Sequence, residues 1–408
     1  MMKKLFCILT VILCVMLVQA SVMAEENAAA YLKEYYDIVF EGDVSAADYN
    51  AALTALGAEP LDCESLTLAD AVVGAVRLAG MEELAQVYGS DTFPNSVDIL
   101  AQIGIAADES NAPYIVCAVN GDLVDDEDDF SGPVSADRAA DLLYRAAEIA
   151  GKGRHYIGRI SDDDILLKLR TCLDSISIFS DEVLNDTGID ILIRGASTGY
   201  SLKYSGFEAR FLEGNTIRYG HDTINHLMQL AALMQSTGFD AYVQIEPKVS
   251  VYEYLLEWGT PSDPTPTYMV QKMDDRYFAF ALEFDMVLEF DTVQQKEAFH
   301  HLVDNFAKKY DDSFDADGNL VKPLLDSSFW QPLYFSTTEM ENQEYMPLVD
   351  NVIGDKAHMY FIHSISLPEN AEAVAEAVKQ IAPDLEVSAE TVYVNPAFYR
   401  YITGTDHQ

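Results

Sequence analysis

Residues 66–72 of this 408-residue chain read LTLADAV, and they open the helix that decides how the first third of the sequence is expected to fold. Thr67 is a natural helix N-cap, and Asp70 places an acid in the first turn, where it interacts favourably with the helix dipole. This helix should end near Gly80, because glycine commonly closes helices. A helix over residues 49–57 precedes it. The pattern is therefore a helix, a short polar loop and a capped helix closed by glycine.

The same pattern recurs further along the chain. Residues 114–121, YIVCAVNG, form the first helix of the second copy, and an acidic loop follows them. Ser135 then opens a helix that we expect to end near Gly151, although the residue three positions after this N-cap is Arg138 and not an acid. The two copies predict a helical repeat domain over residues 25–155.

This repeated pattern resembles the S-layer homology domain, a module that attaches bacterial proteins to cell-wall polysaccharide. The resemblance rests on Phe40 and the Asp-Val pair at 43–44, on an Ala-Leu helix ending in glycine, and on a Thr-x-Ala-acid opening of the next helix. The family normally has an arginine after that threonine, which helps to bind the anionic glycan, where this chain has Leu68 and Ala136. The resemblance suggests Arg138 for glycan binding, although its side chain projects from a different face of the helix than the motif arginine would. A generic helical domain is the alternative.

The first residues have the three parts of a secretory signal peptide. Lys3 and Lys4 give a positive start, residues 5–17 are apolar except for Thr10, and residues 22–24, VMA, place small residues before a cleavage site. We therefore predict a signal peptide over residues 1–24 and a secreted or cell-surface location. No later stretch is long and apolar enough to cross a membrane, so we expect no membrane span in the mature protein.

The composition narrows the possible partners. The formal net charge of −42 becomes −44 when Lys3 and Lys4 leave with the signal peptide, and such a chain repels nucleic acid and anionic lipid. We expect cell-wall polysaccharide or other envelope components as partners. An acidic surface also attracts divalent cations, but neither residues 125–129 (DDEDD) nor residues 311–319 (DDSFDADGN) have the complete ligand spacing of a calcium loop. We predict no metal or cofactor, with weakly bound calcium as the alternative.

Three cysteines, Cys63, Cys117 and Cys172, remain in the mature chain. Three cysteines can form at most one internal disulfide. The sequence has no CxxC motif or Cys/His cluster, which argues against structural zinc. The sequence leaves open whether Cys63 and Cys117 pair.

The rest of the chain has the patterns of two mixed α/β regions. Over residues 156–259 we predict a mixed α/β domain, and residues 260–267, TPSDPTPT, have the composition of a linker. Over residues 268–408 the expected order of elements is βαββαβ, which suggests a ferredoxin-like sandwich. The predicted fold class is α+β and multidomain, with helical repeats resembling S-layer homology domains, a middle α/β region and the sandwich. In the middle region we expect strands at 189–193, 200–204, 207–211 and 241–245, and helices at 222–236 and 250–258.

Residues 220–226, GHDTINH, bring two imidazoles, a carboxylate and an amide to the start of a helix. Asp222 and His226 are four residues apart and share a helix face, so they can pair as a base and the group that orients it, next to His221. Glu246 on the following strand is a further candidate. The alternative is structural, with Asp222 capping the helix and the histidines forming hydrogen bonds within the domain.

The same segment, continued through residues 238–243 (GFDAYV), loosely resembles the core of transglutaminase-like cysteine hydrolases. Those enzymes need a cysteine nucleophile at the start of the helix, and no cysteine follows Cys172 in this chain. We therefore predict a secreted or cell-surface bacterial protein that is not an enzyme and that attaches to wall polymer or acts in the envelope. The alternative is a hydrolase or transferase that uses His221, Asp222 and His226.

Overall fold

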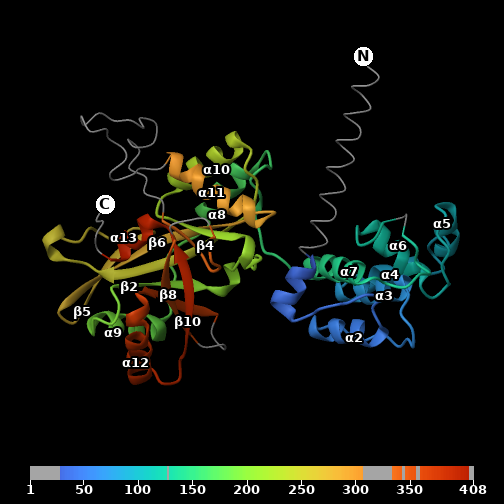
Figure 1. Cartoon of the computed structure of the whole chain (residues 1–408), viewed down its shortest axis with the longest axis horizontal. Coiled ribbons are helices and arrows are strands. Elements are labelled where there is room, and N and C mark those ends of the chain that lie inside the picture. Colours follow the sequence, from blue (N-terminus) through green and yellow to red (C-terminus); the bar gives the residue numbers. More distant parts are fainter. Residues whose placement is uncertain (1–27, 126–127, 307–332, 342–344, 355–358, 404–408) are drawn as a thin grey trace, which may run out of the picture. The chain divides into compact units, whose positions relative to one another are not determined.

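The computed structural model describes residues 28–125, 128–306, 333–341, 345–354 and 359–403 (Figure 1). The chain divides into two compact units, residues 1–154 and residues 155–408. The first is helical and the second is built around a β-sheet. The predicted signal peptide, residues 1–24, lies outside the described residues. Within the described ranges, no helix has both the length and the apolar character that crossing a membrane requires.

Capped helices organise the helical unit. Its described helices are residues 28–36, α2 (Ala46–Ala55), α3 (Leu68–Leu78), α4 (Glu82–Tyr88), α5 (Ser96–Gln102), α6 (Ala112–Asn120) and α7 (Ala136–Ile149). The Thr67 hydroxyl accepts a hydrogen bond from the Asp70 N–H at 3.2 Å, and the Asp70 carboxylate accepts one from the Thr67 N–H at 3.1 Å. Ser135 likewise accepts from the Arg138 N–H at 3.3 Å. These contacts satisfy backbone donors that the first turns of α3 and α7 leave without helical partners.

The two halves of this unit share one core. Gly80 and Gly151 follow α3 and α7 with φ of +72° and +69°, a left-handed conformation that glycine adopts without strain. The Val44 N–H donates to the Val134 carbonyl at 2.8 Å, which joins the segment before α2 to the segment before α7. Helix α3 packs against both α6 and α7, and its inward side chains are buried. The helical unit is therefore one packed body and not a row of separate repeats.

A closed antiparallel sheet forms the second unit. Eight strands pair in the cyclic order β4-β2-β9-β8-β10-β7-β3-β6, and β6 pairs back onto β4, so the sheet closes into a barrel. Strand β1 adds to β4 and strand β5 adds to β6 outside this ring. The strands are β1 (Gly158–Arg159), β2 (Gly199–Tyr204), β3 (Thr216–His221), β4 (Tyr242–Glu253), β5 (Tyr268–Met273), β6 (Arg276–Glu289), β7 (Tyr334–Ser336), β8 (Met346–Gly354), β9 (Tyr360–Ser366) and β10 (Glu386–Val394).

Helices cover the outer face of the barrel. They are α8 (Ile165–Asp174), α9 (Glu182–Ile193), α10 (Ile224–Thr237), α11 (Val293–Phe306) and α12 (Ala371–Ile381). Figure 1 shows α8, α10 and α11 on one side of the barrel, and α9 and α12 on the opposite side. Apolar side chains on one face of each strand, such as Val243 and Ile245 of β4, join helix residues such as Leu230 and Met234 in one buried cluster. The main core therefore lies between the sheet and these helices.

The fold class predicted from the sequence is wrong. It combined helical repeats resembling S-layer homology domains with a middle α/β region and a C-terminal ferredoxin-like βαββαβ sandwich. In the structure, strands from residues 156–259 and strands from residues 268–408 belong to one closed barrel. Strand β4 pairs with β6 along its whole length, so the presumed linker 260–267 connects neighbouring parts of one sheet. Proline-rich composition marks a break in regular structure, and here it does not mark a change of fold.

Several segments take a different structure from the one their pattern predicts. Residues 189–193, predicted as a strand, are the end of α9, because a short apolar run does not distinguish a strand from a buried helix. Residues 207–211, also predicted as a strand, follow a short 3₁₀ turn and place Phe211 in a buried cluster with Val287. Of the predicted helix at 250–258, the first four residues continue β4 to Glu253, and Leu256–Trp258 form a short 3₁₀ helix. Strand β8, which was not predicted, completes the ring.

Candidate functional site in the barrel interior

The structure describes all three residues predicted as a catalytic set, and it brings Asp222 and His226 together while burying His221. His221 ends β3 and is only 5% exposed, and neither of its ring nitrogens has a hydrogen-bond partner among the described residues. Its ring stacks on Tyr219 with 4.6 Å between the ring centroids. Asp222 is 68% exposed, and its carboxylate lies 3.6 Å from Nδ1 of His226, which is an ion-pair distance and too long for a hydrogen bond. Asp222 and His226 thus lie side by side, as their spacing indicates, while both ring nitrogens of His221 are buried.

Arg138, the residue that the resemblance suggested for glycan binding, has carboxylate partners of its own. Its guanidinium forms ion pairs with Asp128 and, at 2.8 Å, with Asp141. The side chain is 20% exposed. An incoming glycan acid would compete with these two carboxylates. Arg138 thus has a structural role at the start of α7.

Polar side chains line the barrel interior. Residues alternate between the two faces of a strand, and Val243, Ile245 and Val249 of β4 pack towards the outer helices. The even-numbered residues of β4 therefore point inwards, as do the side chains directly opposite them on β6 and β2. These inward residues of the three strands include Ser201, Lys203, Glu246, Lys248, Ser250, Ala281, Glu283 and Asp285.

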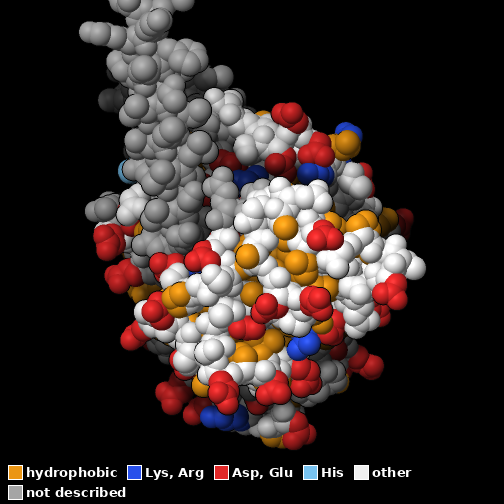
Figure 2. Space-filling view, turned by 90° about the vertical axis from the view of Figure 1, so that its right-hand side faces the viewer, with side chains coloured by type: hydrophobic (Ala, Val, Ile, Leu, Met, Phe, Trp, Pro, Cys, Tyr) orange, Lys and Arg blue, Asp and Glu red, His pale blue; other side chains and the backbone are white. Residues whose placement is uncertain are grey.

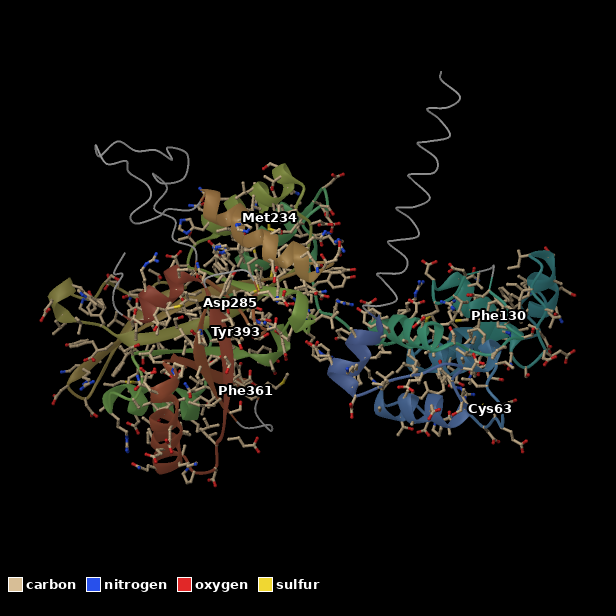
Figure 3. All side chains as sticks on the ribbon, in the orientation of Figure 1. Cys63, Phe130, Met234, Asp285, Phe361 and Tyr393 are labelled. Carbon is tan, nitrogen blue, oxygen red and sulfur yellow. The ribbon has the colours of Figure 1, made fainter. Side chains whose placement is uncertain are left out.

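Asp285 is the centre of this charged group, and Figure 3 marks its position among the strands. Its side chain is 2% exposed and accepts ion pairs from Lys203 and Lys248, each at 2.7 Å. Burial alone would raise the pKa of Asp285, but the two ammonium groups outweigh burial and hold that pKa well below its ordinary value. Lys203 also lies 3.4 Å from Glu246, whose carboxylate accepts the Ala209 N–H at 3.0 Å. The two lysines are thus neutralised by interior carboxylates.

A row of small side chains lies beside the charged group. Ala281, Ser250, Ser201 and His363 are directly opposite one another on β6, β4, β2 and β9, in that order. The hydroxyls of Ser201 and Ser250 are 3.1 Å apart, and Ser250 donates to the Glu283 carboxylate. Each of these inward residues is partly exposed. Solvent therefore reaches the interior face of the barrel along this row.

His363 forms the far end of the row. Its Nδ1 lies 2.8 Å from Oδ2 of Asp350, which is on the interior face of β8. Asp350 is 7% exposed, and its other oxygen, Oδ1, has no hydrogen-bond partner in the part of the chain that the structure describes. A buried acceptor without a donor is unfavourable, so this oxygen marks a place where a donor is missing.

Apolar side chains fill another part of the interior. Phe335, Leu348, Val392 and Val394 form a separate buried cluster inside β7, β8 and β10. The helix α13 (Pro396–Ile402) covers this cluster, and Phe398, Tyr399 and Ile402 pack against it. The interior therefore has an apolar side closed by α13 and a polar side open to solvent.

Metal-ligating side chains do not gather into a metal site in the described part of the chain. Among the described residues, no group of three or more histidine, cysteine, aspartate or glutamate side chains is arranged to hold a metal ion. Cys63, Cys117 and Cys172 are free thiols. The candidate calcium segment 311–319 lies outside the described residues. Acidic side chains are spread over the face in view in Figure 2, with few lysines and arginines among them, as the net charge of −42 requires.

Sequence reasoning named only Glu246 of this interior group. The signal was present, because Glu246, Lys248 and Ser250 alternate with Ile245, Val249 and Val251 in the sequence. A strand with one face in water has the same alternation, so the polar positions indicated a solvent-facing surface equally well.

Comparison with known proteins adds no relative: no protein-family model, no curated protein and no solved structure matches this chain.

Proposed function

We propose that the barrel of residues 155–408 binds a small polar ligand in its interior and that the protein acts as a binding module. The observation that carries this proposal is the row Ala281, Ser250, Ser201 and His363, whose inward side chains are small or polar and partly exposed. Eight-stranded barrels are just wide enough for side chains to fill them or for one small ligand. Because the side chains of this row are small, we expect the barrel to hold a small ligand at the level of the row.

The energetics also favour a binding role for the charged group. Packing alone would be served at least as well by apolar side chains, because a buried ion pair loses about as much hydration energy as it gains in attraction. The outer face of the same strands and the part of the interior under α13 are apolar. The charged group of β2, β4 and β6 lies beside the partly exposed row, where a ligand would meet it.

Cysteine labelling tests whether small molecules enter the barrel. In the full chain, Ala281→Cys should react with neutral methyl methanethiosulfonate at a rate within about tenfold of Ala101→Cys, which is exposed on α5. Ala231→Cys, buried between α10 and the sheet, should react at least about a hundredfold more slowly, because its labelling needs local opening. Peptide mapping separates the new thiol from Cys63, Cys117 and Cys172. If Ala281→Cys reacts as slowly as Ala231→Cys, the interior is closed and the proposal is wrong.

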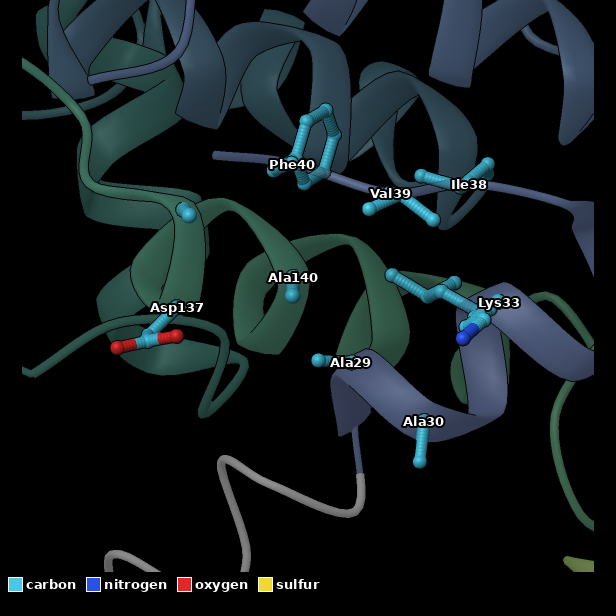
Figure 4. A pocket seen from close by; sticks show the side chains of 10 residues that line it. Ala29, Ala30, Lys33, Ile38, Val39, Phe40, Asp137 and Ala140 are labelled. Carbon is cyan, nitrogen blue, oxygen red and sulfur yellow. The ribbon is translucent and has the colours of Figure 1, made fainter. Parts of the chain in front are cut away.

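A second candidate function, attachment to cell-wall polysaccharide by the helical unit, is favoured by one pocket. The pocket has a volume of about 190 Å³ and lies between residues 28–36, residues 38–40 and the start of α7 (Figure 4). Ala136, where the S-layer homology motif has its arginine, lines it. Lys33 and Asp137 are its charged lining residues and the others are apolar. Lys33 would supply the cation that Ala136 cannot, and the apolar walls suit the faces of sugar rings.

Sedimentation with purified bacterial wall sacculi tests this second candidate. The mature chain should sediment with sacculi that retain their secondary polymers and stay in solution with stripped sacculi. Lys33→Glu should lower the bound fraction at least about fivefold, since one charge reversal near a bound anion changes binding by roughly 1 kcal/mol or more. Lys379→Glu on α12 makes the same charge change on an exposed surface and should have no effect. A wild-type chain that stays in solution with both sacculi overturns the candidate.

A further inference from the structure

We infer that the ligand of the barrel interior carries a small organic cation, such as a primary ammonium group. This inference rests on the proposed binding function and adds to it the charge of the ligand. It follows from which interior charges already have partners and which do not.

The interior lysines are already paired. Lys203 and Lys248 both contact Asp285 at 2.7 Å, and Lys203 also contacts Glu246. An anionic ligand would have to take one of these ammonium groups away from Asp285. That exchange would leave a carboxylate buried without its counter-charge, which is strongly unfavourable. The lysines therefore do not serve as a ready anion site.

Two interior carboxylates can accept further hydrogen bonds or an ion pair. Glu283 accepts a hydrogen bond from Ser250. Lys248 is directly opposite Glu283 on β4, but its ammonium contacts Asp285, and no cation in the described ranges lies within ion-pair distance of Glu283. Asp350 uses Oδ2 for His363 and has a buried Oδ1 without a donor, as described above. Arg218, on the interior face of β3, is held by Glu213. Among the remaining interior charges, the carboxylates of Glu246, Asp285, Glu283 and Asp350 outnumber the two lysines. A positively charged hydrogen-bond donor would therefore balance the charge of this interior.

The geometry fits a short amine that also bears hydroxyl groups. Glu283 and Ser250 lie at one end of the row of small side chains, and His363 with Asp350 lies at the other. Two strand spacings, about 10 Å, separate Ser250 from His363 along the sheet. An ammonium group supplies three donors for the Glu283 end. A hydroxyl on the same molecule would contact Ser201, which is partly exposed.

Charged thiol reagents of similar size test the inference in the full chain. Ala281→Cys is two residues from Glu283 on the same face of β6, so its labelling rate reports the local potential. We compare the labelling rates of the cationic reagent 2-(trimethylammonium)ethyl methanethiosulfonate and the anionic reagent 2-sulfonatoethyl methanethiosulfonate. The cation-to-anion rate ratio at Ala281→Cys should be about tenfold higher than the same ratio at Ala101→Cys. The comparison with Ala101→Cys removes the effect of the acidic surface as a whole.

Two further variants assign the preference to Glu283. Adding Glu283→Gln should lower the cation-to-anion ratio at least about threefold, because it removes the charge and keeps the shape. Adding Ser250→Ala removes the hydroxyl that contacts Glu283 but leaves the charge, so the ratio should stay high. If both reagents label Ala281→Cys with the ratio found at Ala101→Cys, the cation inference is wrong and the binding proposal stands. If neither reagent labels it, the binding proposal itself fails.

Discussion

Replacing Asp285 by asparagine is expected to lower the free energy of unfolding of the barrel unit by about 3–5 kcal/mol at pH 7. The substitution keeps the size of the side chain and removes the charge that Lys203 and Lys248 share. These two lysines are directly opposite each other on β2 and β4, so they would then face one another as like charges without a counter-ion. The effect is a large part of the roughly 5–15 kcal/mol by which a typical protein is stable.

The loss of stability caused by Asp285→Asn should become smaller at low pH. The folded protein holds the pKa of Asp285 well below that of the unfolded chain, mainly because the attraction of the lysines exceeds the effect of burial. The carboxylate therefore stabilises the folded state fully above the unfolded pKa of about 3.9, and this contribution is lost as the pH falls towards the folded pKa. The difference between wild type and Asp285→Asn should be constant from pH 5 to 8 and shrink below about pH 4.

Urea unfolding measures this difference. Both tryptophans of the chain, Trp258 and Trp330, belong to residues 155–408, so their fluorescence follows the barrel unit. Asp263→Asn changes an exposed aspartate and should shift the free energy by less than about 0.5 kcal/mol. A quadruple variant with Lys203→Met, Lys248→Met, Asp285→Leu and Glu246→Gln should recover most of the stability, because it removes the charges of the group together. Our account of the charged group is wrong if Asp285→Asn unfolds like Asp263→Asn.

Local signals in the sequence predicted local structure, but ring closure depends on contacts between distant segments. The caps at Thr67 and Ser135 act within one helical turn, and α3 and α7 begin directly after them. The pairing of β4 with β6, by contrast, joins Tyr242 to Glu289 across the connection that was interpreted as a linker. Propensity and periodicity carry no information on which strand lies beside which. The sequence patterns therefore could not predict the barrel.

The candidate site was missed for a related reason. Alternation shows that Lys248 and Ser250 share one face of β4, but it does not show whether that face meets water or the inside of a closed sheet. His221 and Asp222 are adjacent in sequence, which suggested a common site. The chain leaves β3 between them, so one side chain is buried on the helix-covered face and the other is exposed. Neighbouring positions at the end of a strand need not share surroundings.

Lowering the pH from 6.5 to 3 is expected to destabilise the barrel unit by about 4 kcal/mol through His221 alone. Burial lowers the pKa of His221 to about 3, and the charges of His226 and Lys248 act in the same direction while Asp285 opposes them. In the unfolded chain the imidazole takes up a proton near its ordinary pKa of about 6.5. Because the unfolded state binds this proton first, stability falls as the pH falls below 6.5, until the folded state is protonated near pH 3.

His221→Phe should remove this acid sensitivity. Phenylalanine keeps a flat ring against Tyr219 and has no nitrogen that lacks a partner. At pH 7.5 the variant should match wild type or exceed it by about 1 kcal/mol, since an unsatisfied polar group is lost. At pH 4 it should be more stable than wild type by about 3 kcal/mol, which is the proton-linked part of the change between pH 6.5 and 4.

His301→Phe serves as the control because His301 is exposed on α11. Its acid dependence should follow wild type, because the substitution leaves His221 and its surroundings unchanged. Urea unfolding of the three proteins between pH 7.5 and 3.5 gives the comparison. Parallel curves for wild type and His221→Phe would show that the folded protein accommodates the His221 proton. Such a result would place the ring next to an acceptor or to water, and would remove burial without partners as the reason for its neutral state.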